Sequence, residues 1–420
     1  MNILVYGLGH LGLTTAACLA EKDHKVYVFD PDIKVMEKLL QKDIIFEPGL
    51  EVLLQKGSDA GKLIYLKRVE EAKKVDIVWI TFDTPLDKLG NPDPLSTESY
   101  IEKLSQSLDL RDKFLFISSQ LSVSSIKSLQ KKLKCLSFHY IPENLRLGEA
   151  INIFRNQNFI VVGTNNNNKP SVVEEVLTPF CQRLVWVSNP SAGMVKHAIN
   201  CFLATSITFA NEIARICEMV GASAYEVEAA IRCDARIGEN SYVSPGAAFA
   251  GGTLGRDVTY LCEIAEKSKI DVPLLQSIML SNEEHKKWFL NKLRLIFNNN
   301  LQKKIITVLG LSYKVNSNST RCSLGLEICS HLLSQRAIVK AYDPIVKETG
   351  LENINDFHLT ASFKEAIETT DAIIVVNNYG NLQFPELNEV KKVFILDPNR
   401  YCQKIPKSYV HVLLGEQHHE

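Results

Sequence analysis

Short, uninterrupted apolar runs alternate with longer amphipathic segments over the first part of the chain. Residues 2–6 (NILVY) form one such run, a helical pattern follows from Leu11 to about Glu21, and a second run, KVYVF, ends at Asp30. This order within about 30 residues is typical of a βαβ unit. More apolar runs follow at 75–81, 114–119, 134–140 and 159–163. Because buried parallel strands carry continuous apolar sequence, the pattern predicts an α/β fold with one doubly wound sheet over residues 1 to about 185.

The pattern changes after residue 190. Residues 191–221 contain no proline and keep the apolar spacing of a helix, which predicts one helix of about 30 residues, long enough to connect two domains. Further helix is expected to about residue 295, and NNN at 298–300 indicates a linker. Apolar runs then restart the βα pattern at 304–313, 338–344, 371–379 and 393–398. We therefore expect a Rossmann domain (1–190), a central helical domain (191–297) and a C-terminal Rossmann-like domain (298–420).

Composition narrows the class of protein. The chain has 420 residues, 45% hydrophobic and 23% charged, with a net charge of −1, so no basic surface argues for nucleic acid or an anionic membrane as partner. No apolar run approaches the roughly 20 residues that span a bilayer. The N-terminus, MNILVYG, lacks the basic region of a signal peptide. Ten cysteines without CxxC pairs argue against a zinc site or a disulfide framework, and predict reduced thiols in a cytoplasmic protein.

A glycine-rich turn follows the first predicted strand and opens the first predicted helix. In GLGHLG, Gly7 suits the tight turn, Gly9 suits close approach of a pyrophosphate to the backbone, and Gly12 suits close packing of helix on sheet. The anion would lie at the helix N-terminus, where free N–H groups and the dipole favour negative charge. Asp30 ends the second strand and suits a ribose diol, and no arginine follows it, so NAD is favoured over NADP. The alternative is a glycine turn that binds no nucleotide.

Three polar residues are candidates for chemistry. Lys196 and Asn200 are spaced i, i+4 on the long predicted helix and share one face. Together they provide a charge and an amide that can hold an oxyanion or a hydroxyl, although a solvated surface pair is the alternative. Glu143 follows the 134–140 strand, at the sheet edge where open α/β folds place ligands. For Glu143 the alternative is an exposed loop carboxylate.

Two further segments carry small or cationic residues. The stretch PGAAFAGGTLGRD (245–257) is too rich in glycine and alanine for core, so its backbone is expected to approach a ligand closely. Lys314 and Arg321 follow the 304–313 strand, which ends at the single glycine Gly310 and lacks a GxGxxG. The C-terminal domain therefore has no strong signal for a second dinucleotide, but could bind another phosphorylated ligand.

Taken in order, these segments resemble the UDP-glucose/GDP-mannose dehydrogenase family over nearly the whole chain. GLGHLGL…LA…HKVYVFD is similar to the family's GxGYVGL…LA…GHxVxxxD, and residues 47–50 match its EPGL. PENLRLG (142–148) resembles PEFLxEG, and MVKHAINCFLATSITFANE (194–212) resembles the central helix. DARIG (234–238) fits DxRIG, VLGLSYKVNSNSTRCS resembles VLGLAFKPxTxDxRxS, and AYDP is shared.

The resemblance implies an NAD-dependent enzyme that oxidises the C6 alcohol of a nucleotide sugar, by default UDP-glucose, to a carboxylate in two hydride transfers. It implies a homodimer built around the long helix, in which Arg321 contacts the substrate of the neighbouring subunit. The catalytic positions that it implies are Glu143, Lys196, Asn200, Thr253 and Asp257. The implied cofactor positions are Gly7, Gly9, His10, Leu11, Gly12, Asp30 and Thr84. The implied substrate positions are Glu143, Leu145, Arg146, Lys196, Asn200, Phe249, Gly252, Lys314 and Arg321. No metal is implied.

The chain departs from the family at the position of the catalytic nucleophile. The family loop is PGxGFGGxCxPKD, and here Thr253 stands at the cysteine, Gly255 at the proline and Arg256 at the lysine. A thiolate adds to the intermediate aldehyde to give a thiohemiacetal, whose oxidation yields a thioester that water cleaves. A threonine hydroxyl would need a neighbouring base for this addition, and no histidine is near in sequence. We therefore expect covalent catalysis at residue 253 to be lost.

Three functions are compatible with this departure. The first is an active dehydrogenase that stops at the 6-aldehyde, or oxidises its hydrate slowly, since a positioned hydroxyl, a proton acceptor and a cation suffice for the first step. The second is a silent paralogue that binds NAD and nucleotide sugar, a reading that the change of a family threonine to Gln120 favours. The third is an oxidation–reduction cycle that returns the hydride. Cys233 and Cys262 are candidates for a substitute thiol, with a buried structural role as the alternative.

Overall fold

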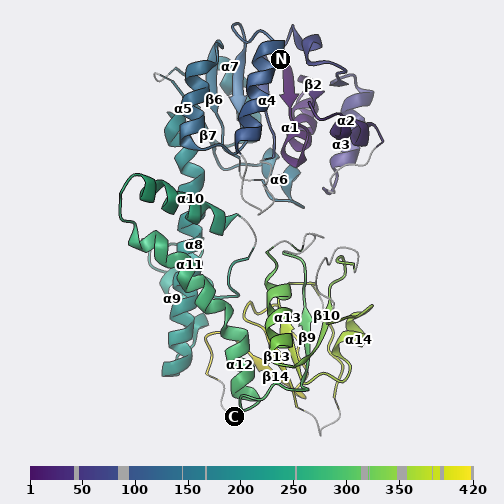
Figure 1. Cartoon of the computed structure of the whole chain (residues 1–420), viewed down its shortest axis with the longest axis vertical. Coiled ribbons are helices and arrows are strands. Elements are labelled where there is room, and N and C mark those ends of the chain that lie inside the picture. Colours follow the sequence, from purple (N-terminus) through teal and green to yellow (C-terminus); the bar gives the residue numbers. More distant parts are fainter. Residues whose placement is uncertain are drawn as a thin grey trace. The chain divides into compact units, whose positions relative to one another are not determined.

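The computed structural model describes residues 1–41, 47–83, 94–143, 145–165, 168–250, 253–313, 320, 322–347, 357–380, 382–387 and 392–417. The chain divides into two compact units, Met1–Ala198 and Ile199–Glu420, which are treated separately below (Figure 1). Helix α8 (Asn189–Val220) begins in the first unit and continues into the second. This confirms the long proline-poor helix predicted from the sequence.

The first unit is built on a six-stranded, all-parallel sheet with strand order β3-β2-β1-β4-β5-β6. Its strands are β1 (Asn2–Tyr6), β2 (Lys25–Phe29), β3 (Leu63–Tyr65), β4 (Ile77–Ile80), β5 (Phe114–Ile117) and β6 (Ser137–Tyr140). Its helices are α1 (His10–Glu21), α2 (Ile33–Leu40), α3 (Leu50–Asp59), α4 (Pro94–Ser107), α5 (Val123–Lys132), α6 (Ala150–Arg155) and α7 (Ser171–Leu177). This is the predicted doubly wound arrangement.

Both faces of this sheet are buried, which explains why most positions of its strands are apolar. In β1, Ile3 and Val5 belong to the apolar core on one face, while Leu4 and Tyr6 belong to the core on the other. Successive side chains of a strand point to opposite faces, so a strand covered on both sides is apolar at consecutive positions.

The prediction of one sheet up to residue 185 is wrong in one respect. Strand β7 (Ile160–Thr164) pairs in parallel with β8 (Leu184–Ser188) in a separate two-stranded sheet. The side chain of buried Asn189 occupies the free edge of β6: its Oδ1 accepts from the Tyr140 N–H (2.8 Å), and its Nδ2 donates to the Phe138 carbonyl (3.2 Å). Because these backbone groups are already bonded, β7 does not extend the main sheet.

The second unit contains helices and then a second parallel sheet. After α8 come α9 (Ala224–Arg232), α10 (Leu254–Lys267), α11 (Pro273–Lys286) and α12 (Trp288–Ile296). The strands are β9 (Ile305–Leu309), β10 (Ile338–Tyr342), β11 (His358–Leu359), β12 (Ala372–Val375), β13 (Val393–Leu396) and β14 (Tyr409–Val412), with α13 (Leu324–Ser334) and α14 (Phe363–Ile367). Their order, β11-β10-β9-β12-β13-β14, repeats the order of the first sheet. The three domain boundaries expected from the sequence stay a prediction.

In each sheet a glycine directly follows the central strand: Gly7 follows β1 and Gly310 follows β9. A Cβ added to Gly12 would lie 1.9 Å from the carbonyl oxygen of Gly7, and one added to Gly325 would lie 1.9 Å from that of Gly310. The helix that follows each central strand, α1 or α13, therefore packs closely on the glycine after that strand at a glycine of its own. In the sequence, Ser323, the N-cap of α13, lies thirteen positions after Gly310, whereas Gly9, the N-cap of α1, lies two positions after Gly7.

Candidate active site

The glycine turn of the first unit has the shape that a pyrophosphate requires. Gly7 has φ +101°, a conformation that favours glycine, and a Cβ there would lie 2.8 Å from the backbone nitrogen of Phe82. Leu11 is buried in α1, which begins directly after the turn. The turn therefore presents bare backbone and a helix N-terminus, which fits a dinucleotide phosphate. A cofactor held here would be bound by the N–H groups of this turn.

Asp30 lies where the sequence predicts it, at the end of β2 beside the turn. Its Oδ2 accepts from the Leu8 N–H (2.7 Å), and its Oδ1 accepts from the Asp32 N–H (2.9 Å). Burial of the carboxyl group raises its pKa despite these hydrogen bonds. The carboxylate is thus fixed against the turn, in the position that a ribose-binding acid of a Rossmann domain takes.

Two acidic residues that the sequence analysis did not select lie against the same turn. The Asp83 Oδ2 accepts from the His10 N–H (2.8 Å) in the first turn of α1. Glu47, which is buried, has one oxygen 2.8 Å from His10 Nε2 and accepts from the N–H groups of Gly148 (2.7 Å) and Ala150 (2.9 Å). The signal for Asp83 was its place three residues after β4, because β4 pairs with β1 and their carboxyl ends share one sheet edge.

The predicted pair Glu143 and Lys196 is in contact. Glu143 follows β6, and its Oε1 lies 3.2 Å from the Nζ of Lys196 near the start of α8. The other oxygen, Oε2, accepts from the Leu145 N–H (2.6 Å), which fixes the carboxylate. Only 10% of the Lys196 side chain is exposed, so the ammonium group is an ordered, largely desolvated cation. The surface-pair interpretation of Lys196 is therefore wrong.

Asn200 and Asp257 form a second buried pair, within the second unit. The Asn200 Nδ2 donates to Asp257 Oδ2, and Asp257 is completely buried at the start of α10. The Arg256 Nε lies 3.7 Å from the other oxygen, Asp257 Oδ1. An amide donor and a guanidinium favour the ionised form of a carboxyl group, and a carboxylate can accept a proton from a hydroxyl. One helical turn separates Asn200 from Lys196 on α8.

Thr253 is an exposed residue at the N-cap of α10, and its side chain makes no capping hydrogen bond. The nearby thiols are poor nucleophiles. Burial raises the pKa of Cys201 to about 11, with Asp257 adding to the effect, and burial also raises the pKa of Cys262. Cys233 is exposed at the end of α9, and its Sγ donates to the Ala229 carbonyl (3.4 Å). No thiol beside Asp257 among the described residues is activated in the way that a catalytic cysteine requires.

The loop before Thr253 is held through its backbone by side chains that sequence reasoning missed. Asn282 binds both the N–H (2.9 Å) and the carbonyl (3.0 Å) of Phe249. Gly246 is bound on both sides, by Asn211 Oδ1 at its N–H (2.8 Å) and by His285 Nε2 at its carbonyl (2.8 Å). These contacts hold the loop backbone in place, and its approach to a ligand stays a prediction. Asn211 lies in the quoted segment 194–212 but was not selected, and Asn282 and His285 belong to none of the quoted motifs, so the sequence offered no signal for them.

The remaining predicted residues divide into two groups. Leu145 is half-buried and packs against the core of the first unit, while Arg146 is exposed. The other four predicted positions lie outside the described residues: Thr84, Gly252, Lys314 and Arg321. Over the described ranges, no group of three or more His, Cys, Asp or Glu side chains is arranged to hold a metal ion. Within the same ranges, no helix combines the length and hydropathy that a membrane crossing requires.

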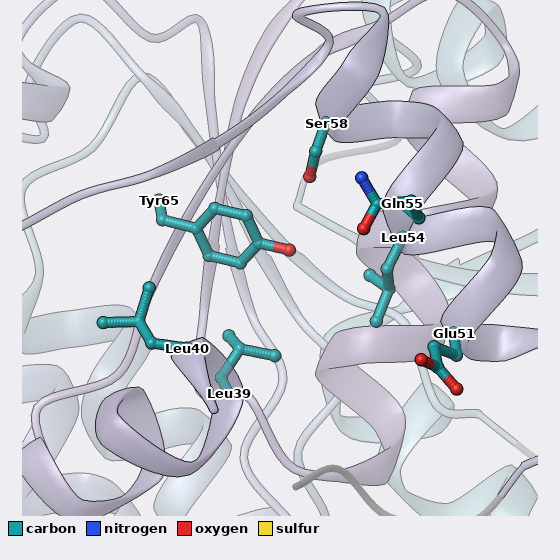
Figure 2. A pocket seen from close by; sticks show the side chains of 7 residues that line it. All are labelled: Leu39, Leu40, Glu51, Leu54, Gln55, Ser58 and Tyr65. Atoms are coloured by element: carbon teal, nitrogen blue, oxygen red, sulfur yellow. The ribbon is translucent and has the colours of Figure 1, made fainter. Parts of the chain in front are cut away.

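A cavity of about 160 Å³ lies elsewhere in the first unit, between the end of α2, helix α3 and strand β3. Figure 2 shows Leu39, Leu40 and Leu54 around the ring of Tyr65, whose hydroxyl points toward α3. Its lining includes none of the predicted cofactor or catalytic residues.

Comparison with known proteins agrees with the geometry. Three models of the UDP-glucose/GDP-mannose dehydrogenase family match: the NAD binding domain over residues 1–181, the central domain over 190–284 and the UDP binding domain over 307–404. A UDP-glucose 6-dehydrogenase of Rickettsia typhi is 31% identical over 399 residues, covering 92% of this chain and 91% of that protein. One from Bacillus subtilis is 31% identical over 400 residues, covering 93% and 86%. The solved structure of a UDP-glucose dehydrogenase from Pyrobaculum islandicum, 24% identical, superposes with a TM-score of 0.84, covering 99% of this chain and 98% of that one.

Proposed function

The chain belongs to the UDP-glucose/GDP-mannose dehydrogenase family, and from that premise we propose that it oxidises C6 of a UDP-sugar, UDP-glucose by default, and stops mainly at the 6-aldehyde. Its class as an NAD-dependent oxidoreductase of this family follows from the matched domains. The observation that carries the proposal is the contrast between the two polar pairs and Thr253, whose exposed side chain makes no capping hydrogen bond. The pairs supply what a first oxidation needs, whereas a threonine hydroxyl is far less acidic than the thiol that the second oxidation uses.

The first oxidation uses the two pairs in different roles. When bound, NAD accepts the hydride from C6. Asp257 takes the proton of the C6 hydroxyl, and Asn200 holds the Asp257 carboxylate in place through its amide. Lys196, fixed by Glu143, stabilises the negative charge that develops on the oxygen. The products are the aldehyde, one proton on the enzyme and one hydride, which carries two electrons, on the cofactor, so the step balances without a nucleophile.

The second oxidation lacks its usual route. Attack of Thr253 on the aldehyde would require removal of its hydroxyl proton, and its side chain is solvent-exposed. The raised pKa values of Cys201 and Cys262 leave those thiols protonated at neutral pH. Acid formation would therefore proceed only through the aldehyde hydrate, and slowly.

Counting reduced cofactor tests the proposal. Purified protein is given NAD and a panel of nucleotide sugars, NADH is measured by absorbance, and the sugar product is identified by mass. One NADH per sugar with an aldehyde product is the expected result, while two NADH per sugar would contradict the impaired second step. Binding of both ligands with no NADH and an unchanged sugar would favour the silent paralogue. An altered sugar without net NADH would favour the oxidation–reduction cycle.

We also propose a homodimer formed through α8, in the cytoplasm. Phe202, Phe209 and Ile216 recur at seven-residue intervals on this helix and are 70%, 51% and 56% exposed. Met219 and Val220 continue the exposed apolar surface toward the helix end. A second copy of the same helix would cover a stripe of this spacing, as in other helix pairs. By resemblance, Arg321 would then reach the substrate of the neighbouring subunit. All ten cysteines are unpaired, which favours a reducing compartment.

A further inference from the structure

The carboxylate of Asp83 lies on the glycine turn at the place where a pyrophosphate is expected. Its Oδ2 accepts from the His10 N–H at 2.8 Å, and a Cβ added to Gly9 would lie 1.9 Å from the same oxygen. Gly9 therefore gives room to a carboxylate of the protein itself in this structure. Asp83 comes from the end of β4, not from the turn, so it approaches the helix N-terminus from the neighbouring strand.

A carboxylate and a phosphate compete for this place because they use the same groups. Both accept from free N–H groups of the first helical turn, and both gain from the positive end of the helix dipole. Two anions cannot share one such site without repulsion. Asp83 is exposed at the surface, so a ligand can reach it, while the protein around its carboxyl group raises its pKa by desolvation. Of the charged groups that face it, His10 lowers the pKa and Glu143 raises it.

The second Rossmann-like turn provides an internal comparison. A Cβ on Gly310 would lie 2.8 Å from the backbone nitrogen of Asn377, just as one on Gly7 would lie 2.8 Å from that of Phe82. The residue after Asn377, in the position of Asp83, is Asn378. Its side chain accepts from the Gly380 N–H (2.9 Å), a contact within its own loop. A carboxylate on the turn is thus not a requirement of this architecture.

We propose that Asp83 competes with the pyrophosphate of the cofactor, so that this residue sets the affinity of the chain for dinucleotides. Binding of the cofactor displaces the carboxylate from the His10 N–H. The inference rests on the NAD part of the proposed function and adds a residue to it that none of the predicted cofactor positions includes.

The test is a set of binding measurements on the full chain, independent of turnover. Dissociation constants for NAD, ADP and adenosine are measured by calorimetry for the wild type, Asp83→Ala and Asp83→Asn. Both variants should bind NAD and ADP at least about 1.7-fold more tightly, which corresponds to about 0.3 kcal/mol, the lower end of the range for one charge at a helix terminus. Adenosine, which has no phosphate, should bind equally to all three proteins.

Asp76→Asn is the matched control, because Asp76 lies before the other end of β4 and its Oδ2 also accepts a backbone N–H, from Asn2 (2.8 Å). This variant should bind NAD as the wild type does. Unchanged or weaker NAD binding in both Asp83 variants would overturn the proposal, as would an equal gain for adenosine. If the wild type and every variant fail to bind any dinucleotide, the proposed function itself fails. Circular dichroism of each variant confirms that the fold is retained.

Discussion

The Asn200 amide donates to the Asp257 carboxylate, joining α8 to the first turn of α10 inside the second unit. Asp257 is completely buried, and the Arg256 Nε lies 3.7 Å from its Oδ1. A buried charge without partners would be costly, and an amide donor and a guanidinium favour the ionised form, which can accept a proton.

Replacement of Asp257 by asparagine should therefore abolish most of the first oxidation. The variant keeps the shape of the side chain but cannot accept a proton, so the initial rate of NADH formation should fall by roughly 10²- to 10⁴-fold. The control is Glu263→Gln on the same helix, because Glu263 is exposed and only weakly paired with Lys267. A rate within about twofold of wild type for Asp257→Asn would exclude Asp257 as the proton acceptor.

The Thr253→Cys variant should gain acid formation. A thiol at the N-terminus of α10 has its thiolate stabilised by the helix dipole, and a thiolate can add to the aldehyde. The measured ratio of NADH to sugar should rise from about one toward two, and the gain should be lost on alkylation. Thr253→Ser, which keeps a hydroxyl, is the control and should show no gain. A folded, NAD-binding Thr253→Cys protein that forms no acid would show that other positions also block the second step.

The apolar stripe of α8 should decide the oligomeric state. Phe209→Asp places a charge in the middle of the stripe, and a buried unpaired charge at an interface costs several kcal/mol. Light scattering coupled to gel filtration should show a dimer for the wild type and a monomer for the variant. Ser206→Asp, at a neighbouring half-buried position that is already polar, should perturb the dimer less. A wild-type protein that is monomeric at micromolar concentration would contradict the proposed homodimer.

Two buried histidines should make the protein sensitive to acid. Burial lowers the pKa of His139 and of His285 to about 4, and each has a ring nitrogen within hydrogen-bonding distance of a backbone carbonyl, of Gly163 and Gly246. Since the unfolded chain titrates at about 6.5, it binds more protons than the folded chain between pH 6.5 and pH 4. Stability should therefore be complete above pH 6.5 and fall by up to about 2 kcal/mol per histidine at pH 5.

Urea unfolding at pH 7.5 and pH 5 measures this loss. Replacing His285 by glutamine, which does not titrate in this range, should lower stability at pH 7.5 but reduce the pH dependence. If the variant loses as much stability between pH 7.5 and pH 5 as the wild type does, His285 does not contribute to this loss.

The features that could be predicted from the sequence are those set by a local sequence pattern or by the end of one strand at a sheet edge. The glycine turn, Asp30 and the long helix follow from strand and helix periodicity, and the contact of Glu143 with Lys196 agrees with the expected place of Glu143 at a strand end. It did not predict the separation of β7 and β8, because that depends on one side chain, Asn189, bonding to β6.

The site residues that the sequence did not predict were missed for the same physical reason. Asn282 and His285 bind the 245–250 loop from α11, and Asp83 binds α1 from the end of β4. Each interaction joins segments that are distant in sequence through one ordinary polar residue. Neither propensity nor spacing distinguishes such a residue from an exposed one, so only the folded arrangement reveals it.

Glu47 has a consequence for anyone who wishes to redesign this protein. One buried carboxylate is shared by His10 of the cofactor turn and by the Gly148 and Ala150 N–H groups just beyond the Glu143 loop. On the proposed roles of these segments, varying residues 145–149 to accept another sugar should also disturb the dinucleotide turn, and the reverse should hold as well. Variants should therefore be selected for both specificities at once.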